Sequence, residues 1–117
     1  MTKLPNRSHA QVSPRKITEY LLSRRHPVGG PKATFFEGLG FKLDNARELE
    51  DALKLHAYNC EIAKIVDNRF GHKYILEGPL TTPSGRSPNV VSVWIMLSDG
   101  SGPSFVTAYP GKEEAKS

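Results

Sequence analysis

The sequence SFVTAYP, residues 104–110, lies near the C-terminal end of the chain. Its β-branched and aromatic residues are typical of a strand, in which side chains alternate between two faces. VVSVWIML at residues 90–97 has the same character. The intervening Asp99–Pro103 is rich in turn residues, so the two segments are predicted to form an antiparallel hairpin.

The pattern extends upstream in two more segments. Glu61–Asp67 and Lys73–Glu77 are predicted strands around a turn at residues 68–71, and Pro79–Ser87 is a predicted loop. Before them, apolar residues recur at helical spacing, which predicts helices near residues 13–24, 31–40 and 44–58. The predicted fold is therefore α+β, with about three N-terminal helices packed on one face of a four-stranded antiparallel meander sheet.

Length and composition predict a single domain over residues 1–117, with a loose lead-in at 1–10 and a frayed tail at 111–117. Ala10–Val12 is a candidate short edge strand. No apolar run is long enough to span a bilayer or to resemble a secretory signal. We therefore expect a cytoplasmic protein without membrane association, or a free-standing version of a domain that is delivered by other means. Cys60 is the one cysteine, which excludes an intrachain disulfide and a cysteine-based zinc site.

Alternation divides the predicted sheet into two faces. One face is aliphatic and suits packing against helices, whereas the other mixes aromatic and hydroxyl side chains. A simple hairpin register places Thr107 opposite Trp94 and Tyr109 opposite Ser92, with Phe105 on the same side and Val106 and Ala108 turned inward. The mixed face is either a binding surface or an ordinary half-exposed sheet face, where such residues are favoured in any case.

The net charge of +4 is unevenly distributed, since residues 1–33 hold seven Lys or Arg and one acidic residue. A basic patch can attract phosphate, although charge alone is weak evidence for nucleic-acid binding. No phosphate loop, dinucleotide fingerprint or metal-ligand spacing is present, so we expect neither a metal nor a cofactor. His56 lies at the edge of an apolar helical stripe and is expected to be structural.

Acid–base chemistry without a metal remains open. RNA carries its own nucleophile, the 2′-hydroxyl, so its cleavage needs a base, an acid and donors to the charged phosphorane. The candidate catalytic residues are His26, Lys32, Thr107, Tyr109 and His72. The candidate substrate-binding residues are Trp94, Ser92, Tyr74, Arg86 and Arg25. Each also has a structural alternative as a turn, strand or solvated surface residue.

Several motifs resemble a family of short uncharacterised bacterial proteins. They include LPN at residues 4–6, HPVGGPKATFF at 26–36, KY at 73–74, EGPL at 77–80, VWI at 93–95 and VTAYP at 106–110. The resemblance covers about residues 4–110 and attaches no activity to the chain.

More distantly, the layout resembles the Barnase–EndoU–Colicin–RelE group of metal-independent ribonucleases, to which many bacterial toxin domains belong. This resemblance implies that His26 and Lys32 supply acid–base or phosphate contacts. It does not place a second catalytic partner, for which His72 is our candidate. Thr107 would hydrogen-bond the scissile phosphate, and Tyr109 would orient or stack on a nucleobase of the RNA. The implied partners are RNA, including tRNA, and a cognate antitoxin or immunity protein with an acidic surface. The leading hypothesis is a metal-independent endoribonuclease of the bacterial toxin type, in which attack by the 2′-hydroxyl leaves a cyclic phosphate. The alternative is a non-catalytic module that binds RNA or protein through the same face, so enzymatic activity is left open.

Overall fold

The structure, a computed structural model, describes residues 3–22, 30–69, 71–97 and 102–111. The described helical elements are η1 (Arg7–His9), α1 (Pro14–Lys16), η2 (Ile17–Leu21), α2 (Gly30–Gly38), η3 (Leu43–Asn45) and α3 (Ala46–Asn59). They are followed by the strands β1 (Ile62–Asn68), β2 (Gly71–Pro79), β3 (Asn89–Leu97) and β4 (Ser104–Pro110). The helices thus precede the strands, as predicted.

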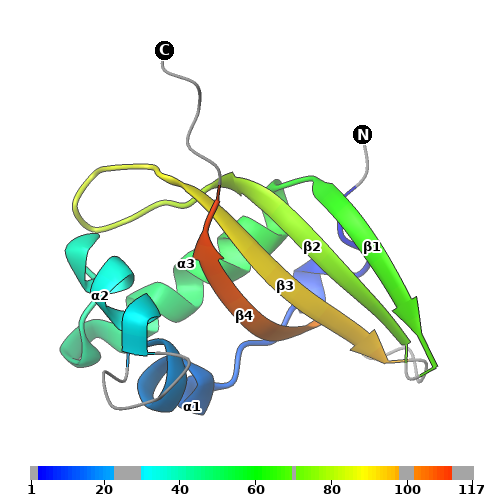
Figure 1. Cartoon of the computed structure of the whole chain (residues 1–117), viewed down its shortest axis with the longest axis horizontal. Helices are drawn as coiled ribbons and strands as arrows, with labels where there is room; N and C mark the ends of the chain where they lie inside the picture. Colours follow the sequence, from blue (N-terminus) through cyan, green and yellow to red (C-terminus); the bar gives the residue numbers. More distant parts are fainter. Residues whose placement is uncertain (1–2, 23–29, 70, 98–101, 112–117) are drawn as a thin grey trace.

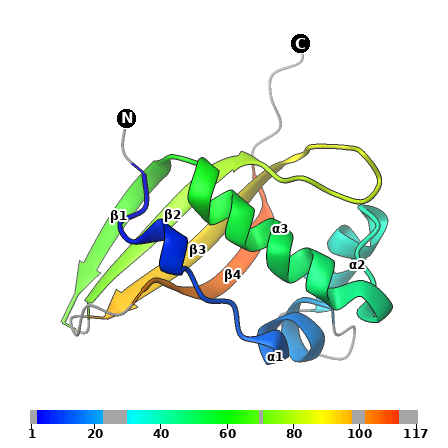
Figure 2. The same cartoon turned by 180° about the vertical axis from the view of Figure 1, so that it is seen from behind.

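The four strands form one antiparallel sheet in the order β1-β2-β3-β4, which is a simple meander. Helix α3 crosses one face of this sheet, as Figure 2 shows from that side. Helices α1 and α2 lie beside the β4 edge, and the face in front in Figure 1 carries no helix in the described part of the chain. The predicted fold class is confirmed.

Helix α3 joins the helical half to the sheet. Leu49, Leu53, His56 and Ala57 follow one another at helical spacing and are all buried. Opposite them, Ser92 and Trp94 of β3 are fully buried, and Trp94 packs edge-to-face on Phe105 of β4 with ring centroids 5.4 Å apart. The face that packs against the helix is therefore the mixed one. The prediction that the aliphatic row faces the helices is wrong.

The predicted hairpin register is also wrong, because β4 contains a bulge. Trp94 pairs with Phe105, but Val93, the residue before Trp94 on β3, pairs with Thr107, so β4 holds one extra residue at Val106. A bulge of this kind shifts the alternation of the strand by one residue. As a result Phe105 and Ala108 both reach the core, while Thr107 and Tyr109 stay on the opposite face.

The N-terminal segment packs against the domain. Leu4 is only 2% exposed and belongs to the main core, and Lys3 forms an isolated bridge to Glu61 at the start of β1. Residues 3 and 4 are therefore held against the domain, whereas most of residues 5–10 are exposed. Gln11 forms a bridge to Ser104, at the predicted short edge strand. The predicted frayed tail lies outside the described residues, apart from Gly111.

Candidate functional site

The candidate site lies at the β4 edge, where a distorted helical turn meets the bulge. Pro14 starts α1, but the chain changes at Ile17 into a π turn, and the amide of Leu22 donates to the carbonyl of Ile17 at 2.8 Å. Such turns are rare and often occur at functional sites. Here the turn buries Ile17 and Leu21 in the core and carries Tyr20. The Tyr20 hydroxyl lies 3.0 Å from the Thr107 hydroxyl.

Lys32 of α2 completes a triangle of polar groups with Tyr20 and Thr107. Its ammonium group donates to the Tyr20 hydroxyl at 2.8 Å and to the Thr107 hydroxyl at 3.0 Å. The same nitrogen lies 5.9 Å from the ring centroid of Tyr109, which is 37% exposed. The bulge places Thr107 and Tyr109 on the strand face turned away from α3, and there both can meet Lys32.

Lys16 adds a second positive charge to this cluster. Its ammonium group donates to the carbonyl of Val106, the extra residue of the bulge, at 3.2 Å, and it lies 5.4 Å from the centroid of the Tyr20 ring. Within the described part of the chain, neither Lys16 nor Lys32 forms an ion pair with a carboxylate. Two uncompensated ammonium groups in a partly buried site favour the binding of an anion.

The charges of the two lysines also act on Tyr20. Burial by itself raises the pKa of the phenol, but hydrogen bonds from Lys32 and Thr107 and the positive charges of Lys32 and Lys16 outweigh it. The net result is a Tyr20 pKa below the ordinary value of 10.0. A phenol whose conjugate base is stabilised in this way is a better proton donor than a tyrosine in water.

A spectroscopic titration tests this arrangement. We expect one tyrosine of the folded protein to form phenolate below the usual pKa of about 10, and this step to be missing in Tyr20→Phe. Lys32→Met should move the step to higher pH. Because the pKa is lower in the folded state than in the unfolded state, Tyr20 should add stability as the pH rises through the folded pKa towards about 10. A Tyr20→Phe variant that loses only a step at or above the usual pKa would contradict the assignment.

The structure brings three of the predicted catalytic residues together, namely Lys32, Thr107 and Tyr109. It adds Tyr20 and Lys16, which the sequence analysis missed. Tyr20 lies four residues after Lys16, which is a spacing at which two side chains meet on a helix. That pairing of a lysine with a tyrosine is the signal that could have identified them. His26 and Arg25 lie outside the described residues.

Other predicted residues lie elsewhere. Trp94, Ser92 and Tyr74 are buried on the α3 side of the sheet and do not line a surface with Thr107, because the bulge changes the register. His72 pairs with Met96, on the Trp94 face, and its Nδ1 lies 2.5 Å from Asp67 Oδ1. The structure therefore separates His72 from Thr107. Arg86 is exposed in the loop between β2 and β3, and no described contact joins its side chain to the cluster.

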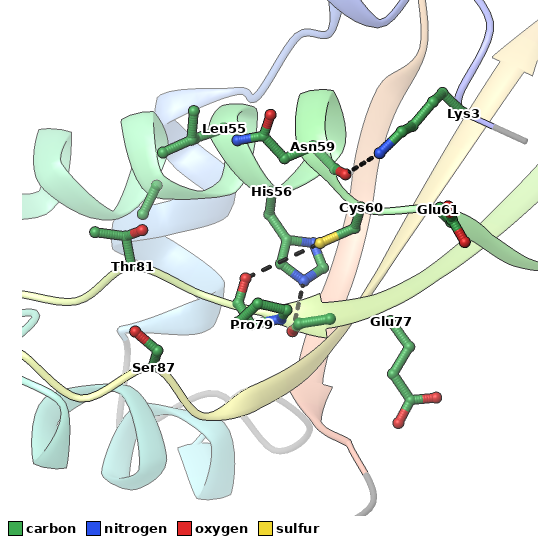
Figure 3. A pocket seen from close by; sticks show the side chains of 12 residues that line it. Lys3, Leu55, His56, Asn59, Cys60, Glu61, Glu77, Pro79, Thr81 and Ser87 are labelled. Carbon is green, nitrogen blue, oxygen red and sulfur yellow. Dashed lines mark hydrogen bonds between the residues drawn. The ribbon is translucent and has the colours of Figure 1, made fainter. Parts of the chain in front are cut away.

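A cavity of about 450 Å³ lies on the other side of the molecule, between α3 and the ends of β1 and β2 (Figure 3). His56 lines it and is held on both sides. Its Nε2 lies 3.1 Å and 3.0 Å from the carbonyls of Gly78 and Val90, so this nitrogen carries the proton. Nδ1 then accepts from the Ser92 hydroxyl at 2.8 Å, and Ser92 accepts from the Trp94 indole at 2.9 Å.

This network keeps His56 neutral and structural, as expected from the sequence. Burial lowers the pKa of His56 more than its hydrogen bonds to the two carbonyls raise it. Cys60, which also lines the cavity, donates to the Pro79 carbonyl at 4.0 Å (Figure 3), and burial raises the pKa of its thiol despite the charge of Lys3. A protonated thiol is a poor nucleophile. The cavity thus holds no activated group, and the β4 edge is the better candidate for chemistry.

Among residues 3–22, 30–69, 71–97 and 102–111, no group of three or more His, Cys, Asp or Glu side chains could hold a metal ion. Within the same ranges, no helix has the length and apolar character needed to cross a membrane.

Residues 3–112 match the sequence model of the family described as Domain of unknown function (DUF6883). The chain belongs to this family. No curated protein matches it in sequence. Among solved structures, the DUF6883 chain is similar to one chain of a structure described as a contact-dependent growth inhibition toxin–immunity protein complex from Klebsiella pneumoniae 342. That similarity has a TM-score of 0.67 at 20% identity and covers 92% of this chain and 97% of the other, which shows a shared fold.

Proposed function

We propose that this DUF6883 chain is a metal-independent endoribonuclease of the bacterial toxin type. The observation that carries the proposal is the ammonium group of Lys32, which donates to the hydroxyls of both Tyr20 and Thr107. Such a set can bind a phosphodiester and stabilise the extra negative charge of a phosphorane. The proposed reaction needs no metal to activate a nucleophile, because RNA provides the attacking 2′-hydroxyl itself.

The roles follow from the contacts. The 2′-oxygen forms a bond to phosphorus while the bond from phosphorus to the 5′-oxygen breaks, which leaves a 2′,3′-cyclic phosphate and a free 5′-hydroxyl. Lys32 and Thr107 contact the phosphate oxygens. Tyr20 donates its phenolic proton to the leaving 5′-oxygen, and the lysines stabilise the phenolate that remains. The base that takes the 2′-proton is assigned to His26, which stays a prediction from the sequence.

Tyr109 is the candidate base-binding residue. Its ring is 37% exposed and lies on the same strand face as Thr107, two residues along β4. An exposed aromatic ring beside a phosphate site can stack on an unpaired base, and such stacking contributes about 1–3 kcal/mol per base. The substrate is therefore proposed to be RNA with unpaired bases, a class that includes tRNA loops.

The toxin assignment draws on the shared fold. The similar chain comes from a toxin–immunity protein complex, and a free ribonuclease would damage the cell that makes it. A cognate immunity protein is therefore proposed as a partner. Since the catalytic edge is basic, an acidic surface on that partner would complement it.

The test is cleavage of total RNA and tRNA by the purified protein in EDTA. We expect products that end in a cyclic phosphate, and no cleavage of DNA of the same sequence, because DNA lacks the 2′-hydroxyl. Dependence on added metal or cleavage of DNA would overturn the mechanism. A shift of RNA mobility without any product would instead support the alternative, a non-catalytic RNA-binding module.

A further inference from the structure

A hollow of about 480 Å³ adjoins the cluster on its helical side. It is lined by Ser13, Arg15, Lys16, Glu19 and Tyr20. Tyr20 lines the hollow and also belongs to the triangle of polar groups that it forms with Lys32 and Thr107. An RNA strand held by Lys32 and Thr107 can therefore pass over Tyr20 into the hollow. The hollow is therefore placed where the next nucleotide of a bound strand would lie.

Lys16 is the cation that the hollow offers to a ligand. One of its N–H groups is used by the Val106 carbonyl at 3.2 Å, which fixes the ammonium group against the bulge. An ammonium group has three N–H donors, so two remain for a ligand. The carbonyl fixes its position without cancelling its charge.

The other charged residues of the hollow largely cancel one another. Arg15 donates to the Glu19 carboxylate from Nε at 3.1 Å and from Nη2 at 3.2 Å, and both side chains are well exposed. Lys16 therefore supplies the net positive charge. The cavity beside His56 contrasts with this, since Glu61 and Glu77 line it together with a single lysine, Lys3, and its net charge disfavours a phosphate.

We propose that this hollow is a second phosphate subsite, in which Lys16 binds the phosphodiester next to the one held by Lys32 and Thr107. The substrate is then a single-stranded stretch of RNA longer than a dinucleotide. A single strand carries one charge on each nucleotide, so a strand that extends over Tyr20 brings its next phosphate to Lys16. The location rests on the proposed function, but the binding itself can be measured without cleavage.

The experiment measures the affinity of fluorescent 2′-O-methyl oligouridines by anisotropy over a range of salt concentrations. These probes cannot be cleaved, because the attacking hydroxyl is blocked. We compare a hexanucleotide, which reaches both subsites, with a dinucleotide, which has one phosphodiester. Lys16→Gln should weaken binding of the hexanucleotide and reduce the slope of log K against log salt by about 0.7, the value for one phosphate contact on a single strand. Its affinity for the dinucleotide should be unchanged.

Two matched variants serve as controls. Lys64→Gln removes one exposed lysine from β1, at the opposite edge of the sheet, and should change neither the affinity nor the slope. Lys16→Arg keeps the charge and should keep the slope, which separates loss of a phosphate contact from damage to the fold.

The inference is overturned if Lys16→Gln and Lys64→Gln bind the hexanucleotide alike, or if Lys16→Gln weakens the dinucleotide as much as the hexanucleotide. Its failure differs from failure of the proposed function. Absence of cleavage together with Lys16-dependent binding would reject the ribonuclease and keep the subsite. Cleavage together with binding that does not depend on Lys16 would keep the ribonuclease and reject the subsite.

Discussion

Replacing Lys32 with alanine is expected to slow RNA cleavage about 100- to 1000-fold. This is the usual loss when one preorganised donor to a developing negative charge is removed. Lys32 touches both Thr107 and Tyr20, so its loss removes a phosphate contact and also the group that does most to stabilise the Tyr20 phenolate. The measurement is the rate of tRNA cleavage in EDTA at saturating RNA.

The control for Lys32→Ala is Lys64→Ala, at the opposite edge of the sheet, which should cleave at the wild-type rate. Thermal unfolding should show that both variants are folded, because the hydrogen bond between Tyr20 and Thr107 remains without Lys32. A Lys32→Ala rate within about threefold of the wild type would remove Lys32 from the reaction.

The order of the elements could be predicted because local signals decide it. Pro14 starts the first helical turn, and Gly40, at φ +100°, follows the end of α2 in a conformation that favours glycine. The strands follow from the two-residue period of segments such as 90–97. None of these signals depends on what the element later packs against, so each can be identified from a few neighbouring residues.

The bulge at Val106 could not be predicted, and it changes which residues of β4 lie on each face of the sheet. Alternation alone assigns Phe105 and Thr107 to one side, yet Phe105 packs on Trp94 in the core and Thr107 meets Lys32 on the other side. Alternation cannot locate an extra residue, because it assumes that every residue of the strand takes part in regular pairing. The same holds for the π turn that carries Tyr20, which replaces the regular helix that the spacing predicts.

Lys32, Thr107 and Tyr109 could be proposed as a group because few residues of this chain suit chemistry without a metal. Their convergence on Tyr20 and Lys16 needed the structure, since Thr107 lies 75 residues after Lys32 and Val106 lies 90 residues after Lys16. His72 illustrates the converse. Its chemistry is suitable, but it lies on the Trp94 face and contacts Asp67.

Replacing Trp94 with alanine is expected to destabilise the fold by about 3–5 kcal/mol, the usual cost of removing a large aromatic residue from a core. Trp94 is 0% exposed, packs on Phe105, and donates to Ser92 in the network that holds His56. The loss is large against a total stability of about 5–15 kcal/mol. Urea unfolding should show a much lower midpoint, and Trp94→Phe should give a smaller decrease in the same direction.

The matched variant is Tyr109→Ala. We expect substitution of Trp94 to reduce stability and substitution of Tyr109 to reduce RNA binding. Tyr109 is 37% exposed beside Lys32, so its loss should weaken RNA binding and leave the unfolding midpoint almost unchanged. Trp94→Phe should unfold earlier but bind RNA normally while folded, because Trp94 faces α3 and not the β4 edge. Weaker RNA binding by Trp94→Phe at an unchanged midpoint would mean that Trp94 lies on the substrate face, as the simple hairpin register requires. The unfolding midpoints and RNA affinities of Trp94→Phe and Tyr109→Ala together therefore test which face of the sheet each aromatic residue occupies.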